Sequence, residues 1–384
     1  MSNIVDYLIW RGDLPVSKEY PFNVVDSMIL ARFSYLIFER IDIKPEETIE
    51  SISKKMSVFK NEDFKYNGDM SLIKCLGKSN RFKDMLVTDF IEKSDISTEK
   101  QFGAITIHIS SKEMYVSFEG TDKTINGWKE DFNLAFLENV PAQMDGVEYV
   151  KKIMTKYKNK NARIGGHSKG GNVAIYSAIA TVEDLHNRII SIDNFDGPGF
   201  CKSVLKKFEN SDIWNKVSTY IPQDSVIGRL LDHKEKCTVV YSVEKGIYQH
   251  DIYSWQIVKD NTVIVDEVTD SSELINGALT EWLENTMPEQ RKMFFDQIFD
   301  LLYAVDVTST IDMKANLIKK APELIRAYRN VDDDDKKTIS EMVRMFIKSY
   351  FSQIKENEAR KLNTLQERIE QRHLRDNKEL PSAD

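Results

Sequence analysis

The chain has 384 residues, and 41% of them are hydrophobic. This length exceeds that of a domain with a single hydrophobic core, which favours one large domain with additions or two domains. A formal net charge of -8 argues against a nucleic-acid partner, because phosphate binding needs a basic surface. The three cysteines, Cys75, Cys201 and Cys237, are too few and too scattered for a disulfide framework. The chain has no apolar run of ~20 residues that could span a membrane, and no secretory signal. We therefore expect a cytoplasmic protein with free thiols.

Residues 1–100 are predicted to form a helical leader or cap packed on the domain that follows. Apolar residues recur at helical spacing in this region, for example at Val24, Met28 and Phe33. From Ala104 the pattern changes to alternation, which predicts two strands, 104–109 and 114–118, joined by a turn at 110–112.

Residues 101–270 are predicted to form an α/β domain. Two helices are expected, at 146–157 and 172–180. Further strands are expected at 163–165, 188–192, 217–221, 237–243 and 253–258. Strands that alternate with helices indicate a mainly parallel sheet with helices on both faces.

Residues 271–384 carry no strand signal and are predicted to form a separate helical region with a charged tail. Helical spacing covers 273–286, 290–305, 313–329 and 336–375. The run Asp332–Asp335 favours a helix N-terminus through the macrodipole rather than a metal site. The tail suits a solvated helix end, and its alternatives are a homodimer contact or a coiled coil that binds a protein partner.

The pentapeptide Gly166-His167-Ser168-Lys169-Gly170 joins a predicted strand to a predicted helix and has the GxSxG pattern of a nucleophile elbow. Glycines two residues before and two after the serine let the strand and helix pack closely. The serine hydroxyl is then exposed above the helix N-terminus, whose backbone donors stabilise a developing negative charge. The sequence therefore predicts acyl transfer with Ser168 as the nucleophile.

The hydroxyl needs a histidine base and a carboxylate that orients it, in the chain order Ser, acid, His. We prefer His250, in the loop after strand 237–243, over His233, and set aside His186 and His373, which lie remote from the elbow. For the acid we prefer Asp224, directly after strand 217–221, with Asp196 in reserve after strand 188–192. Asp224 has an alternative role as the N-cap of a helix.

The oxyanion hole is expected to combine the backbone N–H of Lys169 with Thr121, which follows strand 114–118 in the turn Glu119-Gly120-Thr121-Asp122. His167 is expected to be a packing residue of the elbow. Its side chain would point away from that of Ser168.

These blocks resemble the successive motifs of class 3 (fungal-type) lipases in the α/β-hydrolase fold, and more closely a bacterial Mbeg-like subgroup. The similar blocks are 118–121 with Trp128 and Asp131, 166–171, 196–199, 224–228, the leader Trp10-Arg11-Gly12-Asp13-Leu14, 127–132 and 249–251. The resemblance covers residues 1 to about 260 and implies a hydrolase with Ser168 as nucleophile, Asp224 as acid, His250 as base and Thr121 in the oxyanion hole.

Two positions depart from the lipase pattern. Glu119 stands where an arginine is usual, and would place a carboxylate near the oxyanion region unless it points away. Lys169 stands where a small or aliphatic residue is common, which predicts a cation at the mouth of the site and a preference for an acidic acyl or leaving group.

The sequence thus predicts a serine hydrolase that cleaves a carboxylic ester, small-molecule or lipid-like, by a Ser-His-Asp acyl-enzyme mechanism. Without an apolar lid segment, a smaller soluble ester is favoured over a triglyceride. No cofactor or metal is expected. The alternative is a partner-binding protein on a hydrolase scaffold, with the C-terminal helices as the interaction module.

Overall fold

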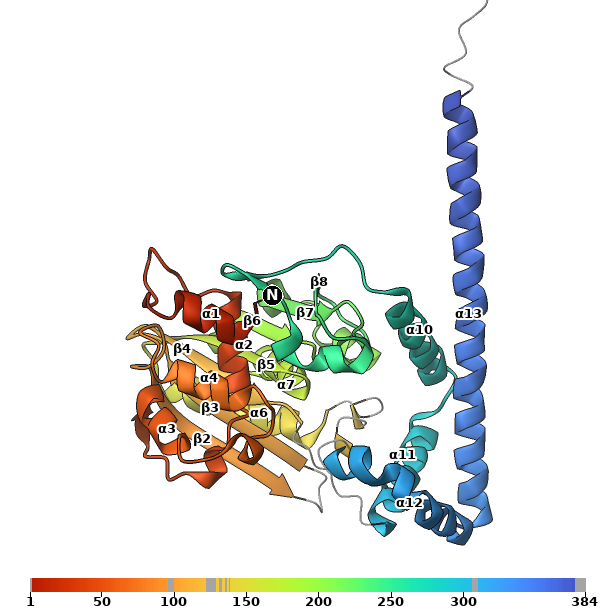
Figure 1. Ribbon diagram of the computed structural model, residues 1–384, viewed down its shortest axis with the longest axis horizontal. Helices are drawn as coiled ribbons and strands as arrows, with labels where there is room; N and C mark the ends of the chain where they lie inside the picture. The colour runs from red at the N-terminus through yellow and green to blue at the C-terminus, as the bar shows by residue number, and fades with distance from the viewer. Residues whose placement is uncertain are drawn as a thin grey trace, which may run out of the picture.

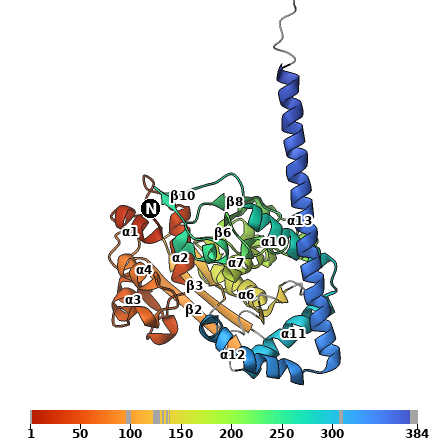
Figure 2. The same ribbon diagram turned by 45° about the vertical axis from the view of Figure 1, so that its right-hand side comes forward.

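The computed structural model describes a chain built on one large sheet. It describes residues 2–95, 100–121, 129–130, 133–134, 137, 139–305 and 310–376, with 310–319 and 361–376 described by backbone alone. An eight-stranded sheet carries helices on both faces, and a group of C-terminal helices stands beside it (Figure 1, Figure 2). The predicted α/β-hydrolase fold with a C-terminal helical region is confirmed.

The strands follow one another across the sheet in chain order. They are β1 (Glu46–Thr48), β2 (Leu86–Asp95), β3 (Lys100–His108), β4 (Glu113–Glu119), β5 (Asn161–His167), β6 (Ile189–Phe195), β7 (Val217–Pro222) and β8 (Cys237–Val240). β1 to β4 pair antiparallel, and β4 to β8 pair parallel. The strand predicted at 253–258 is wrong in part, because only β9 (Ile257–Val258) forms, paired with β10 (Asn261–Thr262) outside the main sheet.

The crossover helices of the parallel strands all lie on one face of the sheet. Crossovers between parallel strands are right-handed, so a sheet that grows in one direction places them all on the same face. This crossover face is covered by α6 (Pro141–Lys156), α7 (Lys169–Ala180) and α9 (Lys202–Lys207), with the one-turn α8 (Glu183–His186) nearby. Residues of α6 and α7 form a buried cluster there with Val116 and Ile164 of the strands.

The leader covers the opposite face and also extends the sheet. Its helices are α1 (Ile4–Arg11), α2 (Val24–Phe33), α3 (Ile49–Met56) and α4 (Asp69–Leu76), and they share a buried cluster with Ile105, Ile107 and Tyr115 of the sheet. The prediction of helices is right here, but it missed β1 and β2. β2 contains a register shift between Thr88 and Ile91, with Asp89 at φ 53°, which interrupts the alternation that marks a strand. Because β2 pairs with β3, the residues on either side of position 100 share the main sheet.

Helix α2 is buried on all sides, and each of its polar residues has a partner. Asp26 forms an ion pair with Arg81, and Arg32 forms one with Asp69; all four side chains are no more than 1% exposed. Ser27 donates a hydrogen bond of 2.8 Å to Asp193 of β6. Burial raises the pKa of Asp193 to about 6, although Ser27 and the Arg163 charge oppose the shift.

Asp193→Asn is expected to raise the free energy of unfolding at pH 8 by about 3 kcal/mol and to leave it nearly unchanged near pH 4. The folded chain holds the Asp193 proton up to about pH 6, whereas an unfolded aspartate releases it near 3.8. The stability that this group contributes is therefore greatest below about pH 4 and falls as the pH rises towards 6. Urea denaturation at both pH values, with exposed Asp184→Asn as the control, checks the difference, and an equal effect at both would contradict it.

The C-terminal helices form at the predicted places. They are α10 (Asp270–Glu284), α11 (Pro288–Ala304), α12 (Thr310–Asn330) and α13 (Asp333–Asp376), and Asp332 caps α13 by accepting from the Asp334 and Asp335 amides. α13 packs against α10, where the Trp282 indole donates to the Met342 carbonyl at 3.0 Å, and then extends beyond the body of the molecule (Figure 1). No described helix is both long and apolar enough to cross a membrane. The three cysteines are free.

Candidate active site

Ser168 occupies a strained turn between β5 and α7. Its backbone has φ 57° and ψ -134°, a left-handed conformation that a non-glycine residue adopts at a cost. A Cβ at Gly166 would lie 2.3 Å from Gly170, and one at Gly170 would lie 2.3 Å from the Phe118 carbonyl oxygen. The two glycines therefore allow the close approach that the GxSxG pattern predicts.

His250 faces Asp196, and this pair differs from the predicted one. His250 Nδ1 lies 2.6 Å from Asp196 Oδ2, with the Asp196 side chain 1% exposed and that of His250 27% exposed. Because the carboxylate accepts a hydrogen bond from Nδ1–H, the Nε2 lone pair is left free to act as a base. Asp196 Oδ1 accepts from the Ser225 hydroxyl at 2.5 Å and from the Gly228 amide at 3.1 Å, so the carboxylate is held in one orientation.

Asp224, the preferred acid of the sequence prediction, makes no hydrogen bond to His250 and has a different set of partners. It accepts from the Gly246 amide at 3.0 Å and from the hydroxyls of Thr269 and Ser271. Burial raises the pKa of Asp224, but these hydrogen bonds lower it by more, so the net shift is downwards. Asp224 therefore fixes the loop before His250 to the start of α10, and the expected contact of His250 with Asp224 is corrected to a contact with Asp196.

The position of the strands explains the correction. β6 lies next to β5, so Asp196, directly after β6, is close to the elbow; Asp224 follows β7, one strand further away. Both aspartates satisfy the chain order Ser, acid, His. Among sequence signals, only the nearness of strand 188–192 to the elbow strand favours Asp196.

His167 is more than a packing residue. Its ring lies 4.6 Å from that of His250, and its Nε2 donates to the His250 carbonyl at 2.7 Å. Burial, with the charges of His250 and Arg32, lowers the pKa of His167 well below its usual value, so the ring is neutral and Nε2 carries its one proton. His167 thus connects the residue before Ser168 to the loop that carries His250.

The Ser168 backbone lies against the residue after Asp196, since a Cβ on Gly197 would lie 2.3 Å from the Ser168 carbonyl oxygen. Within the described part of the chain, the Ser168 hydroxyl donates to no acceptor within hydrogen-bond distance, and the side chain is 7% exposed. Hydrogen bonds between nucleophile and base are often long in an unliganded site and shorten when substrate binds.

Thr121 lies in the turn after β4, and the Lys169 amide begins α7 directly after β5. In the parallel register Phe118 pairs with Gly166, so these two strands end side by side. A Cβ on Gly170 would also lie 2.9 Å from the Gly120 nitrogen, which places the β4 turn against the first turn of α7. Of the other motif residues predicted near here, Gly127, Trp128, Asp131 and Phe132 lie outside the described residues.

The side chains of Lys169 and Glu119 do not stand at the mouth of the site. Lys169 Nζ is buried, 2.8 Å from Glu130 Oε2 and 2.7 Å from Gln101 Oε1. The expectation of a cation at the mouth is therefore wrong, and with it the expected preference for acidic groups. Glu119 is paired with Lys65 at 2.7 Å, which neutralises its charge.

His233 lies away from His250 and holds the turn next to Asp196. Its Nε2 donates to the Gly228 carbonyl at 2.8 Å, and its Nδ1 lies 2.9 Å from Glu235 Oε1. Burial lowers the pKa of His233, but hydrogen bonds with Cys237 and Glu235 raise it by more, to about 10. The imidazolium holds the turn whose Gly228 amide binds Asp196 and cannot accept a proton at neutral pH.

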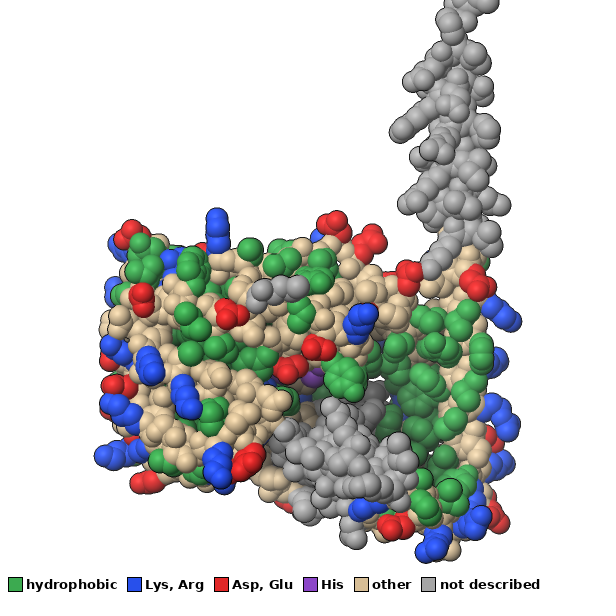
Figure 3. Space-filling view, viewed as in Figure 1, with side chains coloured by type: hydrophobic (Ala, Val, Ile, Leu, Met, Phe, Trp, Pro, Cys, Tyr) green, Lys and Arg blue, Asp and Glu red, His purple; other side chains and the backbone are tan. Residues whose placement is uncertain are grey.

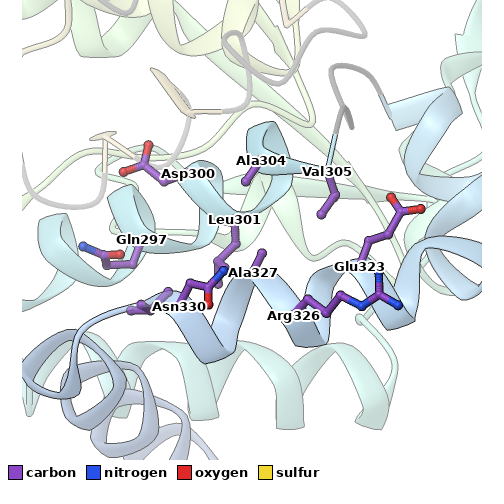
Figure 4. Close-up of a pocket in the computed structure, with 10 residues that line it drawn as sticks. Gln297, Asp300, Leu301, Ala304, Val305, Glu323, Arg326, Ala327 and Asn330 are labelled. Atoms are coloured by element: carbon purple, nitrogen blue, oxygen red, sulfur yellow. The ribbon is translucent and has the colours of Figure 1, made fainter.

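Figure 3 shows histidine atoms beside acidic side chains on one face of the molecule, and hydrophobic side chains gathered over the C-terminal helices. Two cavities lie elsewhere: one of about 500 Å³ between α11 and α12, lined by Leu301 and Ala327 (Figure 4), and one of about 940 Å³ beside β8, lined by His233 and Cys237. Neither is lined by Ser168 or His250.

Comparison with known proteins gives one family and several distant structures. The family described as Mbeg1-like matches residues 76–300. No curated protein matches the chain. A fungal lipase solved with an inhibitor is 13% identical, over 52% of this chain and 83% of that one, with a TM-score of 0.33. Rhizomucor miehei lipase with its propeptide is 12% identical, over 62% and 81%, with a TM-score of 0.33. At this level of similarity, the functions of residues in these lipases are not transferred to this chain.

Proposed function

The chain belongs to the Mbeg1-like family, and from this premise we propose that it is a serine hydrolase that cleaves a carboxylic ester. The observation that carries the proposal is the combination of a strained Ser168 at the strand-to-helix turn with a His250–Asp196 pair at 2.6 Å. A serine hydroxyl held in a strained turn at a helix N-terminus and an oriented imidazole are the parts that nucleophilic acyl transfer requires.

In the proposed reaction, Ser168 Oγ attacks the ester carbonyl while His250 Nε2 removes its proton. Asp196 stabilises the imidazolium that forms, since its carboxylate faces Nδ1 at 2.6 Å. The imidazolium then returns the proton to the departing alkoxide, which leaves an acyl group on Ser168. Water, activated by the same imidazole, resolves the acyl-enzyme.

The oxyanion of the tetrahedral intermediate is assigned to the backbone N–H of Lys169 and to Thr121. The Lys169 amide begins α7, where the helix dipole favours negative charge. The Lys65–Glu119 and Lys169–Glu130 pairs leave no net charge from these four side chains beside the oxyanion. With these charges paired, an uncharged acyl group suits the site better than an acidic one.

The C-terminal helices are proposed to shape the site rather than to form an independent interaction module. Thr269 and Ser271, at the start of α10, donate to Asp224, and Ser272 donates to the Ser225 carbonyl at 2.6 Å. Ser225 in turn donates to Asp196. The region 271–384 is therefore connected by hydrogen bonds to the carboxylate that orients the base.

Incubation with a fluorophosphonate, followed by intact-mass spectrometry, tests the proposal. The native chain is expected to gain one adduct, because an activated serine attacks phosphorus as it would an ester carbonyl. Ser168→Ala and His250→Ala are each expected to abolish the adduct. Ser203→Ala, which changes an exposed serine outside the site, is expected to retain it. A folded native chain that gains no adduct would contradict the proposed function.

A further inference from the structure

The leader contains a fully buried ion pair between Arg32 and Asp69. Arg32 of α2 donates to Asp69 of α4 through Nε at 2.9 Å and through Nη2 at 2.8 Å, with side-chain exposures of 1% and 0%. The guanidinium carbon lies 3.8 Å from the ring centre of Tyr66, 4.4 Å from that of Tyr35 and 5.4 Å from that of Tyr253. Burying such a pair costs desolvation energy, so stability alone is a weak reason for its presence.

One connection runs from the ion pair to the loop that carries the base. Tyr253 comes three residues after His250, and its hydroxyl donates to Asp69 Oδ1 at 2.8 Å. A Cβ on Gly68 would lie 2.6 Å from the Tyr253 ring, so the glycine makes room for this approach. The loop is thus held at two points of the sequence: before His250 by Asp224, through the Gly246 amide, and after His250 by α4 of the leader, through Tyr253.

A second connection runs from the same ion pair to the nucleophile elbow. The ring of Tyr35 lies against Arg32, and its hydroxyl donates to the His167 carbonyl at 2.9 Å. A Cβ at Gly120 would lie 2.0 Å from that hydroxyl, which shows how closely the tyrosine fits against the β4 turn. His167 precedes Ser168 and also donates to the His250 carbonyl. The Arg32–Asp69 pair therefore lies where the supports of Ser168 and His250 meet.

We propose that the Arg32–Asp69 pair, through Tyr253 and Tyr35, is a positioning site that fixes the placement of His250 relative to Ser168. The inference rests on the proposed hydrolase function and adds to it a role for the leader. Within the described part of the chain, neither charged side chain forms a hydrogen bond or ion pair with Ser168, His250 or Asp196, so both act only through the two tyrosines. A small displacement of a base from its nucleophile lowers the rate of the chemical step far more than it weakens substrate binding.

Tyr253→Phe tests the inference, with Tyr7→Phe as a matched control. Both remove a hydroxyl that donates to the aspartate of a buried Arg–Asp pair in the leader, since Tyr7 donates to Asp26 at 3.0 Å and Asp26 pairs with Arg81. Tyr253→Phe is expected to lower kcat on a p-nitrophenyl ester by about tenfold with KM nearly unchanged. Tyr7→Phe is expected to lose similar stability and to keep kcat. Gly68→Ala, which displaces the Tyr253 ring, is expected to act like Tyr253→Phe.

The low-field proton NMR signal of the His250–Asp196 hydrogen bond gives a readout that needs no substrate. It is expected to weaken in Tyr253→Phe and to remain in Tyr7→Phe. Equal kcat values for the two variants, or an unchanged signal in Tyr253→Phe, would overturn the inference. If the native chain has no esterase activity and gains no fluorophosphonate adduct, the proposed function fails, and the proton signal alone still decides whether the ion pair positions His250.

Discussion

Asp196→Asn is expected to lower kcat for ester cleavage by on the order of 10⁴-fold, whereas Asp224→Asn is expected to lower it by less than about tenfold. In the first variant, the asparagine oxygen continues to accept from Ser225 and the Gly228 amide, which leaves its NH₂ group facing His250 Nδ1. An NH₂ group there favours the tautomer with the proton on Nε2, and that nitrogen then cannot accept the Ser168 proton. Initial rates on a short-chain p-nitrophenyl ester measure both effects.

Asp224→Asn is the matched control because it makes the same chemical change at the end of the neighbouring strand. Its loss weakens the contacts to Gly246 and Thr269 but leaves the His250–Asp196 hydrogen bond in place. Thermal unfolding should show that both variants are folded. A loss of activity as large in Asp224→Asn as in Asp196→Asn would return Asp224 to the role of the acid.

Lys169→Met is expected to lower the free energy of unfolding by about 3–5 kcal/mol, because it leaves the Glu130 carboxylate buried without its cation. Glu130 is 0% exposed and accepts from the Gln101 and Ala142 amides besides Lys169. Two amide hydrogen bonds do not replace a full charge in an interior of low polarity. Urea denaturation at pH 7 measures the loss.

The double variant Lys169→Met/Glu130→Gln is expected to recover part of that stability, since no charge is left buried and the glutamine oxygen still accepts from one of the two amides. Lys202→Met breaks a surface pair with Glu284, whose side chains are 77% and 58% exposed, and is expected to change stability by less than about 1 kcal/mol. A loss in Lys169→Met no larger than in Lys202→Met would show that the buried pair is not needed.

Local chemistry along the chain carried several of the predictions. The elbow at Ser168 follows from two glycines at fixed spacing, and the structure shows that both positions exclude a Cβ. The helices of the C-terminal region follow from apolar periodicity, which does not depend on what the helices pack against. The preference for His250 depended on its place after strand 237–243, and the structure places it opposite Asp196.

Other features depend on how the strands are arranged side by side. Asp196 and Asp224 each follow a strand and precede His250, so chain order treats them alike; the adjacency of β6 to β5 distinguishes them. β2 escaped prediction because its register shift at Asp89 breaks the alternation of side chains. The predicted position of the Lys169 side chain at the mouth of the site was wrong because its partner, Glu130, is far away in the sequence.

The sequence by itself determined the fold class, the nucleophile elbow and the helical C-terminal region, since each is encoded in residues close together along the chain. Only the tertiary structure shows which aspartate faces His250 and which side chains neutralise Lys169 and Glu119. It also shows that the leader covers one face of the sheet. The sheet grows in one direction, so its crossover helices cover one face and the leader must cover the other. Such relations join residues that are distant in the chain, and their distances are set by packing rather than by local pattern.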